Sequence, residues 1–210
     1  MTLDGKGSKE LLEAFNFLTV WPEYLRSRYG ELNSLTHLSN PDDPPDVIAH
    51  FSKCSVNIEI TSIEPPHIMQ SERLHNQLGG GARSEMPLSR IPANTQDAKE
   101  IMYIPGNQKA WELVADRCDV RYKMIVERGR RKFSNPKIKT LSSGILLFHG
   151  ETFGDKFEHQ AIEKAFKALQ QIPVCRGWII ALIHRWNSLA YYTAIHSDDV
   201  GFRFEHQEGG

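Results

Sequence analysis

The sequence predicts an α/β protein with a mixed central sheet flanked by helices. Two kinds of hydrophobic pattern alternate along its 210 residues: apolar residues recur every three or four positions in some stretches, and in others they alternate or run without a break. The order of these stretches is one helix, three strands, one helix, one strand, one helix and two strands. This alternation favours a sheet covered by helices over an all-helical or an all-β fold.

The N-terminal part is expected to contain a helix in two pieces and then three strands. Helical spacing of apolar residues predicts the first piece over "SKELLEAFNFLTV", and the second piece begins at Pro22 and ends at Gly30. The run "LNSLTHL" is the first expected strand. The runs "DVIAHF" and "SVNIEITSI" are rich in β-branched residues, and the short "SKC" connection between them predicts a hairpin.

A long segment from Pro65 to Gly106 interrupts this pattern. It contains five prolines, three consecutive glycines and no sustained period. A segment of this length without regular structure is usually a functional flap or a disordered loop. We therefore expect one domain spanning 1–210 with a flexible insertion at about 65–106, since 210 residues suffice for a single domain with a full core.

The remaining chain alternates helices and buried strands. Helical periodicity extends from Asn107 to Phe133, and the strand "SSGILLFH" and the helix "DKFEHQAIEKAFKALQQ" follow. "GWIIALIH" is expected to be a further buried strand, with "LAYYTAIH" as its hairpin partner. The C-terminal half of the long helix is crowded with basic residues, a pattern that suits a solvated helix end as well as an anionic ligand: Lys123, Arg128, Arg130, Arg131 and Lys132.

Composition and charge limit the class of protein. Hydrophobic residues make up 40% and charged residues 24% of the chain, and no apolar run approaches the roughly 20 residues of a membrane-spanning helix. The first residues lack the apolar core of a secretory signal, so we expect a cytoplasmic protein without membrane contact. Three widely spaced cysteines and nine histidines without HxH or HExxH spacing argue against a disulfide framework and a zinc site.

The small net charge of −1 hides an uneven distribution. The first 64 residues contain five Lys and Arg against ten Asp and Glu, whereas residues 65–140 contain fourteen against eight. A polyanion-binding surface beside an acidic, metal-binding pocket would produce this asymmetry, and so would a solvated basic helix after an acidic segment. Both interpretations remain open on charge alone.

Two carboxylates in the predicted hairpin stand out. Asp46 opens its first strand, and Glu59 lies inside the second strand on the same face as Thr61. Antiparallel pairing would bring Asp46 close to the end of the strand that carries Glu59 and Thr61. An ionised carboxylate at a dry site is costly without a cation beside it, so we expect positive charge here. The alternatives are a turn-capping Asp46 and an edge strand with Glu59 facing water.

The spacing of these residues resembles a known signature. Pro45-Asp46, twelve residues, and then Glu59-Ile60-Thr61 is similar to the PD-(D/E)XK signature of the restriction-endonuclease-like nuclease superfamily. The expected element order from Lys9 to His149 resembles the αβββαβ core of that superfamily. More narrowly, "PPDVIA" and "NIEITSIEPP" resemble uncharacterised members in which the strand reads I-E-V-T in place of E-x-K. The resemblance implies hydrolysis of nucleic-acid phosphodiester bonds with Mg²⁺ or Mn²⁺.

The resemblance also implies roles for particular residues. Asp46, Glu59 and the backbone carbonyl of Ile60 would hold the metal, and Glu13 would add a carboxylate from the first helix, with Glu10 and Glu31 behind it. Thr61 stands in the position of the signature lysine without its charge. Either a cation arrives from the long helix, with Lys123 as the one candidate that can also titrate, or the site binds without cutting. Phosphate contacts are expected from the same helix, at Arg121, Arg128, Arg131 and Lys132.

Three functions therefore remain open from the sequence. The first is a magnesium-dependent endonuclease, with DNA ahead of RNA as partner although the sequence does not choose between them. The second is a catalytically inactive nuclease-fold module that binds nucleic acid or a protein partner. The third is self-association, for example as a homodimer, through an edge formed by "LAYYTAIHSDDVGFRF".

Overall fold

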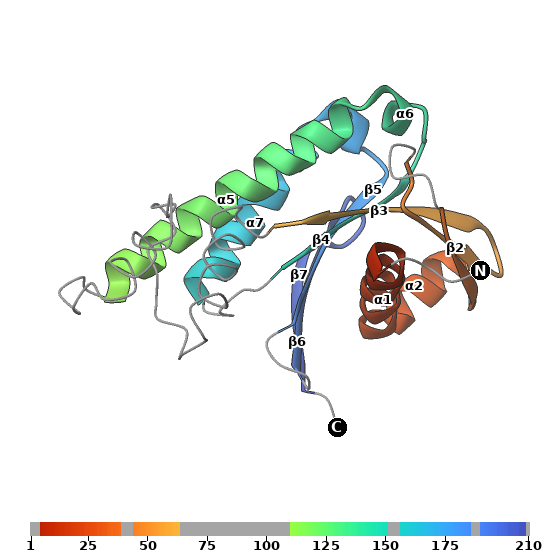
Figure 1. Cartoon of the computed structure of the whole chain (residues 1–210), viewed down its shortest axis with the longest axis horizontal. Helices are drawn as coiled ribbons and strands as arrows, with labels where there is room; N and C mark the ends of the chain where they lie inside the picture. Colours follow the sequence, from red (N-terminus) through yellow and green to blue (C-terminus); the bar gives the residue numbers. More distant parts are fainter. Residues whose placement is uncertain (1–4, 39–43, 64–109, 151–155, 186–189, 209–210) are drawn as a thin grey trace.

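Seven strands form one mixed sheet in the computed structural model, which describes residues 5–38, 44–63, 110–150, 156–185 and 190–208 (Figure 1). The strands lie side by side in the order in which they occur along the chain. β3 pairs with β4 and β4 with β5 in parallel, and every other neighbouring pair is antiparallel. The strands are β1 (Leu32–His37), β2 (Val47–Phe51), β3 (Ser55–Ser62), β4 (Gly144–His149), β5 (Trp178–Arg185), β6 (Ala190–Ser197) and β7 (Gly201–Glu208).

Helices cover both faces of this sheet. Two helices that precede the strands lie on one face, and two that form the crossovers between parallel strands lie on the other (Figure 1). The first pair is α1 (Gly5–Val20) and α2 (Pro22–Tyr29). The second face carries α5 (Ala110–Ser134) with the short α6 (Pro136–Lys139), and α7 (Lys156–Gln170), which is followed by the 3₁₀ turn η1 (Pro173–Cys175).

The predicted α/β class with a mixed sheet between helices is confirmed. The hairpin of β2 and β3 forms as predicted, and the helices expected between the later strands connect β3 to β4 and β4 to β5 as parallel crossovers. The expected element order contained two final strands, whereas the structure has three, because "GFRFEHQE" adds β7 to the edge of the sheet. The insertion expected at 65–106 lies outside the described residues. No helix in the described ranges combines the length and the apolar character needed to cross a bilayer.

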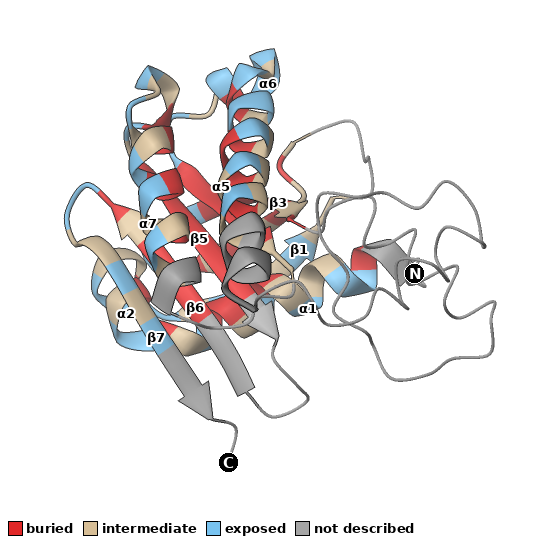
Figure 2. Cartoon of the chain, turned by 90° about the vertical axis from the view of Figure 1, so that its left-hand side faces the viewer, coloured by how far each residue is buried: buried red, intermediate tan, exposed pale blue. Residues whose placement is uncertain are grey.

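The strands divide the hydrophobic core into two layers. Alternate residues point to opposite faces of a sheet, so Ile58, Ile60 and Leu147 pack toward α1 and α2. Leu146 and Phe148 pack toward α5 and α7, and Figure 2 shows the buried strands behind helices whose outer sides are exposed. This alternation decides the position of the acidic residue in β3, which must face α5.

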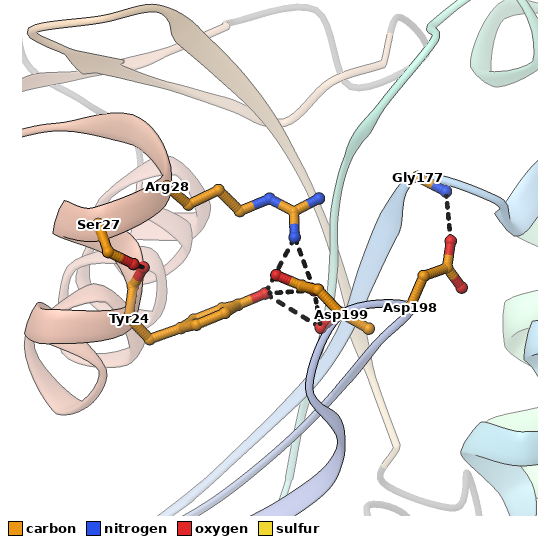
Figure 3. A network of polar contacts seen from close by, with 7 residues as sticks. Tyr24, Ser27, Arg28, Gly177, Asp198 and Asp199 are labelled. Carbon is orange, nitrogen blue, oxygen red and sulfur yellow. Dashed lines mark hydrogen bonds and ion pairs between the residues drawn. The ribbon is translucent and has the colours of Figure 1, made fainter.

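A polar cluster joins α2 to the turn between β6 and β7 (Figure 3). Oδ1 of Asp199 accepts hydrogen bonds from Oγ of Ser197 at 2.7 Å, from Nη1 of Arg28 at 2.8 Å and from Oη of Tyr24 at 3.3 Å. The neighbouring Asp198 accepts from the backbone N–H of Gly177 at 3.3 Å. One carboxylate oxygen thus collects three donors, which fixes the start of β7 against the first helical layer.

Gly144 is needed where β4 begins between two neighbouring strands. A Cβ atom at this position would lie 2.7 Å from the backbone oxygen of Asn57 and 2.8 Å from the ring of Trp178. G144A is therefore expected to lower the free energy of unfolding by about 2 kcal/mol, because neither the strand backbone nor the buried ring can withdraw. Urea denaturation compared with S143A, at the exposed neighbouring position, checks this. Equal stability of the two variants would contradict it.

Candidate functional site

Asp46 directly precedes β2, and its carboxylate bonds it to the neighbouring strand β3. Oδ2 of Asp46 accepts a hydrogen bond from the backbone N–H of Ile60 in β3 at 2.7 Å, and the backbone oxygen of Asp46 accepts from Leu38 at 3.0 Å. The strand register pairs Val47 with Ile58, so the next position places Asp46 opposite Glu59. The expected approach of the two acidic residues through the hairpin is confirmed, and Asp46 does more than cap a turn.

Glu59 is a buried carboxylate in a central strand. Its position opposite Leu146 directs it to the α5 face, and only 4% of the residue is exposed, which excludes the edge-strand alternative. Oε1 accepts a hydrogen bond from Lys132, whereas Oε2 is buried without a hydrogen-bond partner among the described residues. Burial is the main cause that raises the pKa of Glu59 above its ordinary value; the charge of Lys132 opposes this shift and that of Asp46 adds to it.

Lys132 supplies a cation to the buried Glu59 and the half-buried Asp46. Its ammonium forms an ion pair with Glu59 and lies 3.9 Å from Oδ2 of Asp46, and its side chain is 28% exposed. Lys123, expected in the catalytic role, is exposed on another side of α5. The residue that reaches the acidic pair is instead one that we had expected only among the phosphate contacts.

The arginines of α5 differ in burial and in their contacts with β3. Arg121 is 4% exposed and donates to the backbone oxygen of Ile63 at 2.9 Å, and Arg128 donates to the backbone oxygen of Ser62. These bonds supply donors to two backbone carbonyl groups at the end of β3. The buried position of Arg121 does not support its expected contact with nucleic acid, whereas Arg131 is exposed as such a contact requires.

Glu10 of α1 acts on Glu59 through its charge. Its charge adds to the rise in the pKa of Glu59, and its carboxylate forms an ion pair with Nε2 of His37 at 2.8 Å. Glu13, our first candidate, is half-buried on α1, and Glu31 forms an exposed ion pair with Arg26 at 2.8 Å. The charge of Glu10 therefore acts on Glu59, and the expected role of Glu13 stays a prediction.

Asp46 and Glu59 form a small set of oxygen donors for a hard divalent cation. No group of three or more His, Cys, Asp or Glu side chains that would hold a metal occurs among the residues that the structure describes. Asp46 and Glu59 nevertheless supply two carboxylates, and Oε2 of Glu59 is a buried oxygen with an open lone pair. Mg²⁺ is usually held by one or two carboxylates together with water and phosphate oxygens, so the pair fits this ion. The backbone N–H of Ile60 serves Asp46, and Thr61 lies half-buried on the face of Glu59, as expected.

His149 lies at the end of β4 on the opposite face, next to the same end of β3. Its backbone oxygen accepts from Ile63 at 2.7 Å, and its register partner is Ser62. Burial, together with the charges of Lys9 and Arg128 and against the opposing charge of Glu10, lowers the pKa of His149 from 6.5 to about 4. The ring is therefore neutral wherever the fold is intact above this pH.

This neutral histidine gives a pH dependence. Between pH 6.5 and about 4 the unfolded chain binds a proton that folded His149 does not, so the free energy of unfolding is expected to fall as the pH falls through this window. An NMR titration of the imidazole nitrogens, with the signal assigned by H149Q, should give a midpoint of about 4. A midpoint near the ordinary value would contradict the buried, neutral ring.

Sequence reasoning missed Glu10 with His37 and the role of Lys132 at Glu59. The signal for Lys132 is its helical spacing from Arg121, Ile125 and Arg128, which places all four on the side of α5 that faces β3. The Glu10–His37 contact joins α1 to β1 and has no local signal in the sequence.

No family model matches this chain, and searches of curated proteins and of solved structures return no match. A functional proposal for this chain therefore depends on the arrangement of the side chains at the site.

Proposed function

We propose that this chain is a metal-dependent phosphodiesterase that hydrolyses nucleic acid on a restriction-endonuclease-like core. The observation that carries the proposal is the convergence of Asp46 and Glu59 from adjacent strands, with the ammonium of Lys132 bonded to one and close to the other. A purely structural ion pair would need one carboxylate. The charge of Asp46 also raises the pKa of Glu59, and a divalent cation between the two carboxylates would relieve this repulsion.

Asp46 and Glu59 would hold Mg²⁺ or Mn²⁺ in this proposal. When bound, the ion supplies an acidified water molecule and neutralises charge on the phosphate. The hydrogen bond from Ile60 to Oδ2 of Asp46 keeps that carboxylate oriented before any ligand arrives. Such preorganisation avoids the cost of arranging the charges during the reaction.

Lys132 would take over the role that Thr61 cannot perform. The signature resembled by this hairpin has a lysine where Thr61 stands, and Thr61 offers a hydrogen bond but no charge. Lys132 comes from α5, and its side chain is 28% exposed beside Glu59, which suits a donor to a phosphate oxygen or to the attacking water. The exposed Arg131 next to it would add positive charge toward the nucleic-acid backbone.

Cleavage of single- and double-stranded DNA and RNA, with Mg²⁺ or Mn²⁺ and with EDTA, tests the proposal. We expect metal-dependent cleavage that D46N and E59Q each reduce by at least about 100-fold, because each removes one anionic ligand. The control E31Q changes a carboxylate that pairs with Arg26 at the surface and should leave the rate unchanged. Cleavage that survives both D46N and E59Q would exclude this site.

One observation favours a second candidate, a nucleic-acid-binding module without catalysis. The ammonium of Lys132 already compensates Glu59, so the site has a cation of its own. In that case binding of a labelled oligonucleotide would weaken steeply with salt and would not change with EDTA. Binding that requires Mg²⁺ would favour the hydrolytic site instead.

A further inference from the structure

β7 forms an edge of the sheet that no other described strand covers (Figure 2). It is eight residues long and pairs with β6 over its whole length without a register shift. The outer side of an edge strand presents backbone groups that can pair with another strand. β1, at the other edge, has six residues and an irregular register between Leu32 and Ser34, and such irregularities disturb further pairing.

The side chains of β7 form two different faces. Phe202 and Phe204 are half-buried and pack against the core layer of α7, and the ring of Phe204 lies 3.6 Å from that of His159. Arg203 and Glu205 are exposed and point to the opposite face, two residues apart. One positive and one negative side chain thus flank Phe204 at equal spacing.

We propose that two copies of this chain associate by antiparallel pairing of their β7 strands about a twofold axis at Phe204. In this register Arg203 of each copy lies opposite Glu205 of the other, so both charge pairs are attractive. Opposite charges at directly facing positions of an antiparallel pair stabilise it, and like charges destabilise it. A twofold interface requires a surface that is complementary to itself, and this charge pattern meets that requirement.

The same register joins the apolar sides of the two copies. Phe204 faces its counterpart, and the half-exposed rings of both copies become covered. The sheets then continue into one another, so the backbone groups at both edges find partners. The cluster around Asp199 fixes the turn from which β7 starts, so the strand is held in place before pairing (Figure 3).

A second copy fits this edge better than an unrelated extended segment. Any strand can supply backbone hydrogen bonds, but only a segment with the reversed charge order meets Arg203 and Glu205 favourably. β7 itself has that order when it runs antiparallel. The occupant is therefore this chain, and the association does not depend on metal or nucleic acid.

The test is sedimentation equilibrium of the full chain over about 1 to 100 μM in EDTA. We expect a concentration-dependent dimer whose dissociation constant rises at least about tenfold in R203E and in E205R, because each places like charges opposite one another. The double variant R203E/E205R exchanges both charges, restores the attraction and should dimerise like the parent. R26E makes the same charge change in an exposed ion pair elsewhere and should not affect the dimer.

Three results would overturn the proposal: a monomer at every concentration, a dimer that R203E does not weaken, or a double variant that stays as weak as the single ones. Both side chains are exposed, so folding should persist, and circular dichroism verifies it. Since no cleavage is measured, failure of this association is distinguishable from failure of the proposed hydrolysis.

Discussion

K132M is expected to lower the free energy of unfolding by about 3 kcal/mol at pH 8 in metal-free buffer. The substitution leaves Glu59 buried with a charge that no described cation compensates. Removal of one partner from a buried ion pair is costly because the remaining charge stays away from water. Urea denaturation at fixed pH measures the loss.

The loss should be smaller at pH 5. The pKa of Glu59 is already raised by burial, and removal of the opposing charge of Lys132 raises it further. Between the ordinary value of 4.5 and this raised value, folded Glu59 holds a proton that the unfolded chain does not. The stability contribution therefore falls as the pH rises through this window, and K132M should be most destabilised above it.

Two further variants separate this explanation from a general packing defect. E59Q removes the buried charge itself and leaves Lys132, which is 28% exposed and can turn toward water, so its stability should stay within about 1 kcal/mol of the parent. The double variant E59Q/K132M should recover most of what K132M loses. K123M, at an exposed position of the same helix, should cost little. A K132M protein as stable as the parent at pH 8 would contradict the role of Lys132 as the compensating cation.

Local sequence patterns predict most helices and strands of the fold. They also predict the acidic half of the site, Asp46 and Glu59. The hairpin could be predicted because β-branched residues alternate on both sides of a short connection, and the register then brings Asp46 opposite Glu59. β7 was missing from the expected element order because its alternation is formed by only two phenylalanines among charged residues. Periodicity detects strands through buried side chains, and residues 201–205, the part of β7 whose burial the structure describes, are only half-buried or exposed.

The identity of the cation at the site depends on how α5 is rotated about its own axis, and local sequence patterns do not determine this rotation. Helical spacing defines which residues of α5 share a side, but the side that faces β3 depends on packing with Ile125 and Val126. Lys132 lies seven residues after Ile125 and on the same side, whereas Lys123 lies two residues before it and points elsewhere. The sequence led us to expect a phosphate contact for Arg121. Its actual partner, the backbone oxygen of Ile63, is distant in the sequence and is identified only by the structure.

K132M should also separate catalysis from metal binding. If Lys132 donates to the phosphate or to the attacking water, its removal is expected to reduce cleavage by about 100- to 1000-fold, the usual effect of losing one preorganised donor to a developing charge. Binding of Mn²⁺ should stay as tight or become tighter, because the ammonium no longer competes for Oε1 of Glu59. D46N should lose both properties.

The measurement pairs Mn²⁺ titration calorimetry with single-turnover cleavage at pH 8, because a proton on Glu59 at lower pH would weaken metal binding in K132M, and circular dichroism verifies that the variant is folded. K132R preserves the positive charge and should retain more activity than K132M, since the role assigned to Lys132 is electrostatic. K123M serves as the matched control on the same helix. Parallel loss of metal binding and cleavage in K132M would mean that Lys132 only maintains the pocket, and unchanged cleavage would remove it from the reaction. If Lys132 pairs with Glu59 in the resting protein and with the phosphate during the reaction, K132M should bind Mn²⁺ at least as tightly as the parent and cleave more slowly.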